Sequence, residues 1–239
     1  MPIRTFHYTY PSCGQILFRA LLDTCYPRYC PVCSVRLGAE EEGICSECLL
    51  SLERYTEEVL QGFARLEGAF CLFDQLLAGY NFRKGGAMRE VIHSIKFESN
   101  RALGLVMGRM LARHFALSSS DYDFIVPIVS HWRRAGRRGY HQAEILARGV
   151  SMVSGIPVAT QALRRKSQSI SQTDLGRQDR LQAMTGAFSL GRDKLPRGSR
   201  ILLMDDVLTS GATLIAAADV LSEVTPSSLV ALVLAVDEA

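Results

Sequence analysis

The stretch Ile201–Thr213 most constrains the fold of this 239-residue chain, because it joins an apolar run, two adjacent acids and a small-residue loop. The run Ile201–Met204 is unbroken and apolar, which is typical of a strand buried on both faces of a parallel sheet. Asp205 and Asp206 follow it, at the end of a strand where open α/β sheets bind their ligands. Apolar residues at helical spacing follow Thr213, so the loop is expected at the N-terminus of a helix.

The loop between the two acids and that helix has the composition of an anion site. Its residues are Thr209, Ser210, Gly211, Ala212 and Thr213. They offer consecutive backbone N–H groups and hydroxyls, and the glycine lets the chain approach an anion closely. The pattern predicts a phosphate on this loop and a ribose diol on Asp205 and Asp206. The structural alternative is a buried strand that ends in a capped turn, since Thr or Ser often caps a helix.

This stretch resembles the phosphoribosyl pyrophosphate motif of type I phosphoribosyltransferases, and further segments resemble the competence protein F (ComF/GntX) family in the same order. Those segments are Pro127, the run from Arg133 to Ala143, the Leu-Arg-Arg at 163–165, Gln172 and Arg180. The resemblance covers the chain from about Cys30 to its end. It implies a type I phosphoribosyltransferase-like α/β fold, which is a mainly parallel sheet with helices on both faces, together with a small N-terminal zinc ribbon.

The resemblance also implies a ligand, 5-phosphoribosyl 1-pyrophosphate with Mg²⁺, and a reaction, substitution at its anomeric carbon. Asp205 and Asp206 would bind the ribose hydroxyls and stabilise the cationic ring, so they are the expected catalytic residues. The segment after Pro127 takes the place of the pyrophosphate loop. Its expected anion contacts are Arg133, Arg134, Arg137 and Arg138. Residues 164–182 resemble the lid of these transferases, and Arg165 is a further expected contact.

Basic residues gather around this expected site, although the formal net charge of the chain is only +3. Residues 131–180 hold ten Arg and Lys against three acids. Because the planar guanidinium suits phosphate oxygens, a pyrophosphate ligand would use this excess. A nucleic-acid backbone would use it as well, and a solvated basic face is the structural alternative.

Four cysteines near the amino terminus form the pattern C-x2-C-x11-C-x2-C. They are Cys30, Cys33, Cys45 and Cys48. Thiolates at this spacing predict a tetrahedral structural zinc site. Disulfides are the alternative, which the expected cytoplasmic location disfavours. The pattern leaves open whether the zinc ribbon contacts DNA, another protein or only the neighbouring domain.

The expected division of the chain has two parts. An N-terminal helix, the zinc ribbon and a connecting helix occupy residues 1–66, and the phosphoribosyltransferase-like domain occupies 67–239. No apolar run approaches the roughly 18 to 20 residues that span a bilayer. The amino terminus lacks the apolar core of a secretory signal. We therefore expect a cytoplasmic protein without membrane insertion.

Hydrophobic spacing predicts alternating helices and strands from residue 69 onward, as in an open parallel sheet. Helices are expected over 49–66, 86–96 and 101–115 and around Ile145–Val153, and strands over 124–129 and 228–236. Residues 69–82 are expected as a hairpin that turns at Gly79.

Two functions remain open on the sequence. The first is a phosphoribosyltransferase of unknown acceptor, in the setting of DNA uptake and natural competence that the family resemblance implies. The second is a non-catalytic scaffold that binds phosphoribosyl pyrophosphate, single-stranded DNA and competence or DNA-processing proteins. A polar acceptor-binding segment is not recognisable near the last expected strand.

Overall fold

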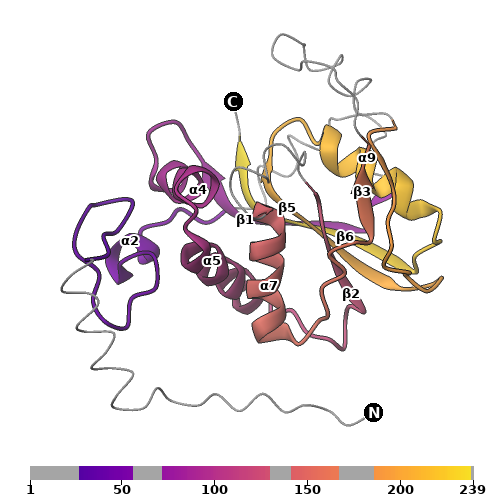
Figure 1. Cartoon of the computed structure of the whole chain (residues 1–239), viewed down its shortest axis with the longest axis horizontal. Helices are drawn as coiled ribbons and strands as arrows, with labels where there is room; N and C mark the ends of the chain where they lie inside the picture. Colours follow the sequence, from indigo (N-terminus) through magenta and orange to yellow (C-terminus); the bar gives the residue numbers. More distant parts are fainter. Residues whose placement is uncertain (1–26, 56–71, 130–140, 167–185, 238–239) are drawn as a thin grey trace.

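A computed structural model describes residues 27–55, 72–129, 141–166 and 186–237. Its centre is a parallel sheet with the strand order β1-β6-β5-β2 (Figure 1). The strands are β1 (Gln75–Phe82), β6 (Ser228–Asp237), β5 (Arg200–Leu208) and β2 (Phe124–Pro127). A parallel bridge from Ile125 to Val158 continues the sheet beyond β2.

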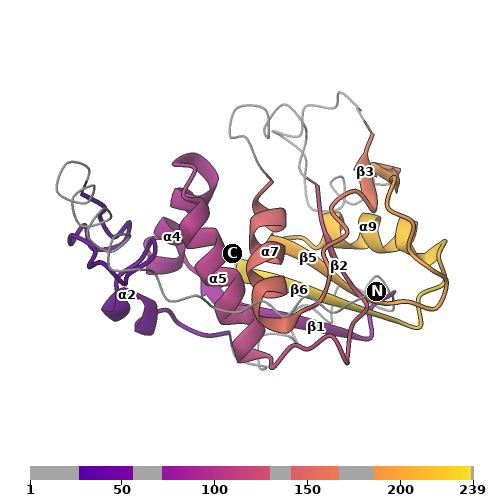
Figure 2. The same cartoon turned by 60° about the horizontal axis from the view of Figure 1, so that its bottom comes forward.

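Helices cover both faces of the sheet, so the expected fold class is confirmed (Figures 1 and 2). One layer holds α4 (Ala87–Phe97), α5 (Arg101–His114) and α7 (Gln142–Ser154), and the other holds α9 (Ala212–Ser222). The short strands β3 (Leu163–Arg165) and β4 (Phe188–Leu190) pair antiparallel, and β4 contacts α9. Across these described ranges, no helix is long and apolar enough to span a membrane.

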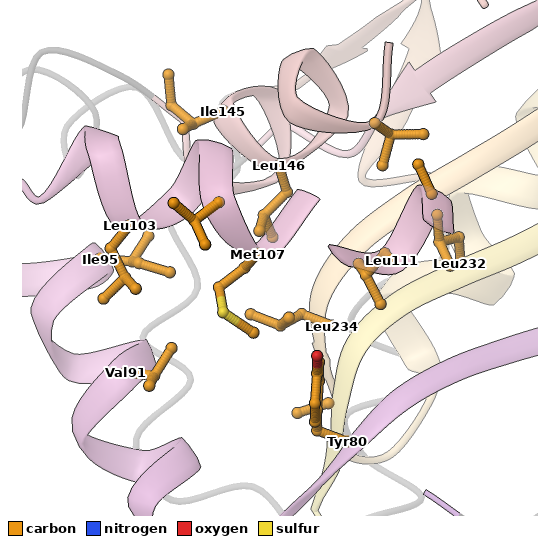
Figure 3. Packing of buried hydrophobic residues seen from close by; sticks show 14 of the residues in the cluster. Tyr80, Val91, Ile95, Leu103, Met107, Leu111, Ile145, Leu146, Leu232 and Leu234 are labelled. Atoms are coloured by element: carbon orange, nitrogen blue, oxygen red, sulfur yellow. The ribbon is translucent and has the colours of Figure 1, made fainter. Parts of the chain in front are cut away.

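A separate apolar core lies under each helical layer. In the core beneath α4, α5 and α7, Met107 and Leu111 of α5 pack against Leu234 of β6, with Tyr80 of β1 beside it (Figure 3). Both α5 side chains are fully buried. Burying a side chain of this size stabilises the folded state by about 1.5–3 kcal/mol, so this seam fixes α5 on the sheet.

Several predicted elements are confirmed within one or two residues, and two are wrong. The expected hairpin over 69–82 is wrong, because β1 is one continuous strand that runs parallel to β6 and contains Gly79. The expected helix over 49–66 is also wrong at its start. Helix α2 (Ser46–Leu50) ends at Leu50, and residues 51–55 are not helical.

An irregularity crosses three neighbouring strands at Gly79, Leu234 and Asp206. These three residues are not paired with one another. Pairing resumes at the next residue of each strand, at Tyr80, Ala235 and Val207, and the register is the same before and after. Side chains in a regular strand alternate between faces with a period of two residues. Here this alternation changes phase, since Met204 and Val207, three positions apart, both contact the core beneath α4, α5 and α7.

Glycine at position 79 is required by close packing at this irregularity. A Cβ atom there would lie 2.4 Å from Leu111 Cδ2 and 2.9 Å from the carbonyl oxygen of Leu234. Both distances are far below van der Waals contact, so any side chain would push β1 away from β6 or from α5. Close packing of β1 against β6 and α5 at this irregularity therefore requires a position without a side chain.

The segment that holds the four cysteines, residues 27–55, packs beside α4 and α5 (Figure 2). Leu37 and Ile44 are buried in the same core as Leu103 of α5. Glu42 forms an ion pair with Arg109 of α5. The backbone N–H of Tyr55 donates to Gly79 O at 3.1 Å, which joins the end of this segment to β1. One face of the cysteine segment therefore contacts the α/β domain.

Candidate functional site

A cleft of about 790 Å³ lies at the carboxyl edge of the sheet, between α4, the N-terminus of α7 and the loop before α9. Its volume is in the range of ligand pockets, about 300–1,000 Å³. Five residues predicted from the sequence line it together: Asp205, Asp206, Thr209, Thr213 and Arg165. Ser210, Gly211 and Ala212 belong to the same loop but do not line the cleft. The predicted contacts Arg133, Arg134, Arg137 and Arg138 lie outside the described residues, and so do residues 167–182 of the expected lid.

The expected phosphate loop leads directly into α9. Gly211 precedes the helix with a φ of 74°, a left-handed conformation that favours glycine. As the N-cap residue, Gly211 makes no side-chain hydrogen bond to the helix. The first backbone N–H groups of α9 are therefore not capped from this position, and a helix N-terminus of this kind favours an anion.

The two acids lie in the second half of strand β5, whose carboxyl end the sequence predicted for them. Strand β5 continues to Leu208, and Asp205 stands opposite Val233 of β6. The pairing of β5 with β2, in contrast, ends at Met204. Adjacent residues of a regular strand face opposite sides, so the change of phase at Asp206 accounts for both acids lining one cleft.

Lys96 of α4 is the cation nearest to the acid pair among the described contacts. Its Nζ atom lies 2.8 Å from Asp206 Oδ2, and both side chains are mostly shielded from water. The backbone N–H of Asp206 donates to Asp205 Oδ1 at 2.9 Å, and the N–H of Val207 donates to Asp206 Oδ1 at 2.8 Å. These contacts fix the direction of both carboxyl groups.

Burial raises the pKa of Asp205 to about 8, and the neighbouring charge of Asp206 adds to the effect. The ammonium of Lys96 and the hydrogen bond from the Asp206 N–H oppose this rise. In the free site, burial therefore favours the protonated form of Asp205, and the ammonium of Lys96 beside the pair opposes that preference.

The wall opposite the loop was not predicted from the sequence. Arg89, His93 and Lys96 line the cleft from α4, and Asp237 lines it from the end of β6. Positions 89, 93 and 96 follow the spacing of one helical face. The spacing of apolar residues in this helix predicted only its buried face. The spacing of Arg89, His93 and Lys96 indicates a polar face in the same way.

The N-terminus of α7 contributes a buried amide to the cleft. Gln142 is only 5% exposed and lines the cavity. Its Nε2 atom has no hydrogen-bond partner within the part of the chain that the structure describes. An unpaired buried donor is costly, so this N–H group is placed to meet a ligand oxygen. Before it stands His141, whose pKa is lowered by burial.

The four predicted cysteines form a second cluster, away from the cleft. All four Sγ atoms lie within 4.8 Å of one another, and those of Cys33 and Cys45 are 3.6 Å apart. Tetrahedral zinc with Zn–S bonds of 2.3 Å needs sulfur atoms about 3.8 Å apart, so the cluster fits this metal. Burial of Cys30 opposes ionisation of its thiol, but backbone N–H groups of Cys45, Cys33 and Val32 lower its pKa to about 7.

The comparisons with known proteins agree with this arrangement. Residues 135–239 match the family model described as a phosphoribosyl transferase domain. The matched region is under half of the chain, and the parallel sheet with helices on both faces agrees with a phosphoribosyltransferase-like fold. The chain is also similar to Competence protein F of Haemophilus influenzae, with 35% identity over 94 residues. The aligned region is 38% of this chain and 41% of that relative's length.

Two solved structures match part of this chain at low sequence identity. The allosteric regulatory enzyme of purine biosynthesis matches with 19% identity and a TM-score of 0.37, over 54% of this chain and 25% of its own. Purine phosphoribosyltransferase from Pyrococcus horikoshii matches with 14% identity and a TM-score of 0.33, over 56% of this chain and 71% of its own.

Proposed function

We propose that the cleft binds 5-phosphoribosyl 1-pyrophosphate. The main support for this proposal is that two adjacent acids and two threonines of the loop before α9 line one cavity. Asp205 and Asp206 accept hydrogen bonds from the ribose hydroxyls. Thr209 and Thr213, with the N-terminus of α9, hold the 5-phosphate.

Mg²⁺ accompanies this ligand in the proposal. Carboxylate oxygens are the ligands that Mg²⁺ prefers, and Asp205 and Asp206 supply them at the place where the ribose binds. Lys96 already contacts Asp206. When bound, the ion neutralises charge on the leaving pyrophosphate.

The reaction that this site supports is phosphoribosyl transfer to an acceptor. The bond from the anomeric carbon to the pyrophosphate oxygen breaks, and pyrophosphate leaves with the electron pair. The acceptor's lone pair forms the new bond to that carbon. Positive charge develops on the ribose ring, where Asp205 and Asp206 stabilise it. Arg165, Gln142 and the arginines at 133, 134 and 138 interact with the pyrophosphate oxygens.

The cysteine cluster is proposed to hold structural zinc. Its thiol donors fit zinc, and Leu37, Ile44 and Leu103 bury the segment against α5. Zinc then stabilises the layer that carries Lys96. The proposed division of the chain remains residues 1–66 and 67–239.

Similarity to Competence protein F supports a setting in DNA uptake or natural competence for this protein. The test of function is pyrophosphate release from phosphoribosyl pyrophosphate with Mg²⁺, in the presence of fractionated cell extract. Release that depends on one fraction supports a transferase and identifies its acceptor. Tight binding without release in any fraction would instead favour a ligand-binding scaffold.

A further inference from the structure

We infer that Lys96 is an exchangeable counter-ion of the cleft. In the free protein it pairs with Asp206, and when the ribose hydroxyls bind that acid it transfers to the pyrophosphate group of the ligand. This inference rests on the proposed function. It assigns a ligand contact to helix α4, which lies outside the residues 135–239 that match the family model.

Three of the four carboxylate oxygens in the acid pair already have partners in the free protein. Lys96 Nζ lies 2.8 Å from Asp206 Oδ2, and the N–H of Val207 donates to Asp206 Oδ1 at 2.8 Å. Asp205 Oδ1 accepts the N–H of Asp206 at 2.9 Å. The two N–H groups belong to the backbone of β5 and stay in place, whereas the ammonium is at the end of a flexible four-carbon chain. Lys96 is therefore the partner that a ribose hydroxyl displaces from Asp206.

Lys96 differs in this respect from the two other basic residues that line the cleft from α4. Arg89 pairs with Glu90 at 3.1 Å, and His93 lies 3.7 Å from Glu98. Neither glutamate is among the described residues that line the cleft, so a ligand does not compete for these pairs. The partner of Lys96 is instead one of the acids proposed to bind the ribose. Ligand binding therefore acts on the Lys96 pair in particular.

A displaced ammonium needs a new partner in this cleft. The Lys96 side chain is mostly shielded from water, and a shielded charge that loses its partner is destabilised. The pyrophosphate group supplies that partner, because its charged oxygens are strong hydrogen-bond acceptors. Asp237 also lines the cleft, and a cation on the pyrophosphate offsets the repulsion between these two anions. Tight binding thus requires a ligand with both a diol for Asp206 and an anionic group for Lys96.

The same exchange assists product release. When pyrophosphate departs after ribosyl transfer, Lys96 loses its new partner and returns to Asp206. There it competes with the ribose hydroxyls of the product. The cleft therefore favours the substrate, which has both groups, over the product, which keeps the diol but not the pyrophosphate.

The test is calorimetric titration of the full chain with three ligands, at one pH and one Mg²⁺ concentration. Phosphoribosyl pyrophosphate has the diol and the pyrophosphate, ribose 5-phosphate lacks the pyrophosphate, and inorganic pyrophosphate lacks the diol. We expect Lys96→Met to lower the ratio of the affinity for phosphoribosyl pyrophosphate to that for ribose 5-phosphate tenfold or more. A changed pKa of Asp205 acts on both sugars through the same acids, so it cancels in this ratio. Affinity for inorganic pyrophosphate should fall less than threefold, because without a diol Lys96 stays on Asp206.

Three further variants make the result specific. Lys84→Met, which replaces an exposed lysine away from the cleft, should leave the ratio unchanged. Lys96→Arg keeps the charge and should keep the ratio within threefold of the wild type. Lys96→Gln leaves a hydrogen-bond donor beside Asp206, so it disturbs the fold less than methionine does, and its ratio should fall like that of Lys96→Met.

The outcomes separate this inference from the proposed function. An unchanged ratio in folded Lys96→Met or Lys96→Gln would overturn the inference, while binding of phosphoribosyl pyrophosphate by the wild type would still support the proposed function. A loss of affinity for inorganic pyrophosphate as large as that for phosphoribosyl pyrophosphate would also overturn it, because Lys96 would then bind phosphate without leaving Asp206. Failure of the wild-type chain to bind phosphoribosyl pyrophosphate would overturn the proposed function as well.

Discussion

The ammonium of Lys96 lies 2.8 Å from a carboxylate oxygen of Asp206, and this contact ties helix α4 to the acid pair of β5. Only 28% of the lysine side chain and 19% of the aspartate side chain are exposed. Such a pair is screened less by salt than a surface pair. It therefore sets the charge of the cleft before any ligand enters.

Replacing Lys96 with Met should move the pH dependence of ligand binding upward. Burial and the charge of Asp206 raise the pKa of Asp205 to about 8, and Lys96 limits that rise. The ribose hydroxyls bind the ionised pair best, so affinity should increase as pH rises through about 8 in the wild type. The midpoint should lie higher in Lys96→Met and lower in Asp206→Asn. Calorimetric titrations of phosphoribosyl pyrophosphate with Mg²⁺ between pH 6 and 9.5 measure it.

Lys84→Met is the control for this series, because Lys84 is an exposed lysine that does not line the cleft. Its midpoint should equal that of the wild type. A Lys96→Met midpoint that did not move, or moved downward, would contradict the charge balance described for the acid pair.

Replacing Gly79 with Val should both destabilise the fold and weaken ligand binding. The new side chain would clash with Leu111 and with the carbonyl of Leu234, and overpacking of this kind costs about 1–3 kcal/mol. The strained strands carry the change of phase that turns Asp206 into the cleft. Urea unfolding and ligand titration measure the two effects.

Gly38→Ala provides the matched glycine control, since the nearest atom to its added Cβ is the flexible end of Glu41 at 3.6 Å. It should lower neither stability nor affinity appreciably. If Gly79→Val lost stability but bound the ligand as tightly as the wild type, the sheet irregularity would have no role in placing the acids.

The sequence predicted the parallel fold and one side of the cleft, because those features are local. Apolar runs with acids and a glycine loop after them predict strand, site and helix within a single segment. The irregularity that turns Asp206 into the cleft instead crosses to Gly79 of β1, which is distant in sequence and was interpreted as a turn. A glycine that is needed for close packing cannot be distinguished from a turn glycine by its own sequence neighbours.

Lys96 and Asp237 were missed for a related reason. Each has an ordinary local setting, on the polar face of an amphipathic helix and at the end of a buried strand. Their role follows from the strand order, which places the ends of β1 and β6 beside α4 and the acids. Only tertiary structure supplies that proximity.

Removing metal from the cysteine cluster should loosen α5. Leu37 and Ile44 pack in the same core as Leu103, and Glu42 pairs with Arg109. Binding energy at a structural zinc site contributes to folding directly. Cys45→Ser or a chelator should therefore speed amide exchange in residues 103–111, as measured by mass spectrometry. Restored zinc should reverse the chelator effect, and unchanged exchange without metal would contradict the coupling.

Asp123→Asn should remove a stabilising contribution that depends on pH. Arg200 donates to both carboxylate oxygens of Asp123, at 2.8 Å from Nη2 and 3.3 Å from Nε, and these bonds lower the pKa of Asp123 to about 2. A lowered carboxyl pKa stabilises the fold above the unfolded value near 4, and this contribution disappears as pH falls toward 2. The variant should thus unfold more easily than the wild type at pH 7, and the difference should shrink in acid. Urea unfolding at several pH values tests this; a difference that grew in acid would refute it.

The central claim is that Asp205 and Asp206 bind the ribose of phosphoribosyl pyrophosphate. Its most direct test is calorimetric titration of that ligand, with Mg²⁺ present, into the wild type and into the double variant Asp205→Asn, Asp206→Asn. The wild type should bind, and the double variant should lose binding while it keeps the wild-type circular dichroism spectrum. A folded double variant that retained the wild-type affinity would contradict the claim.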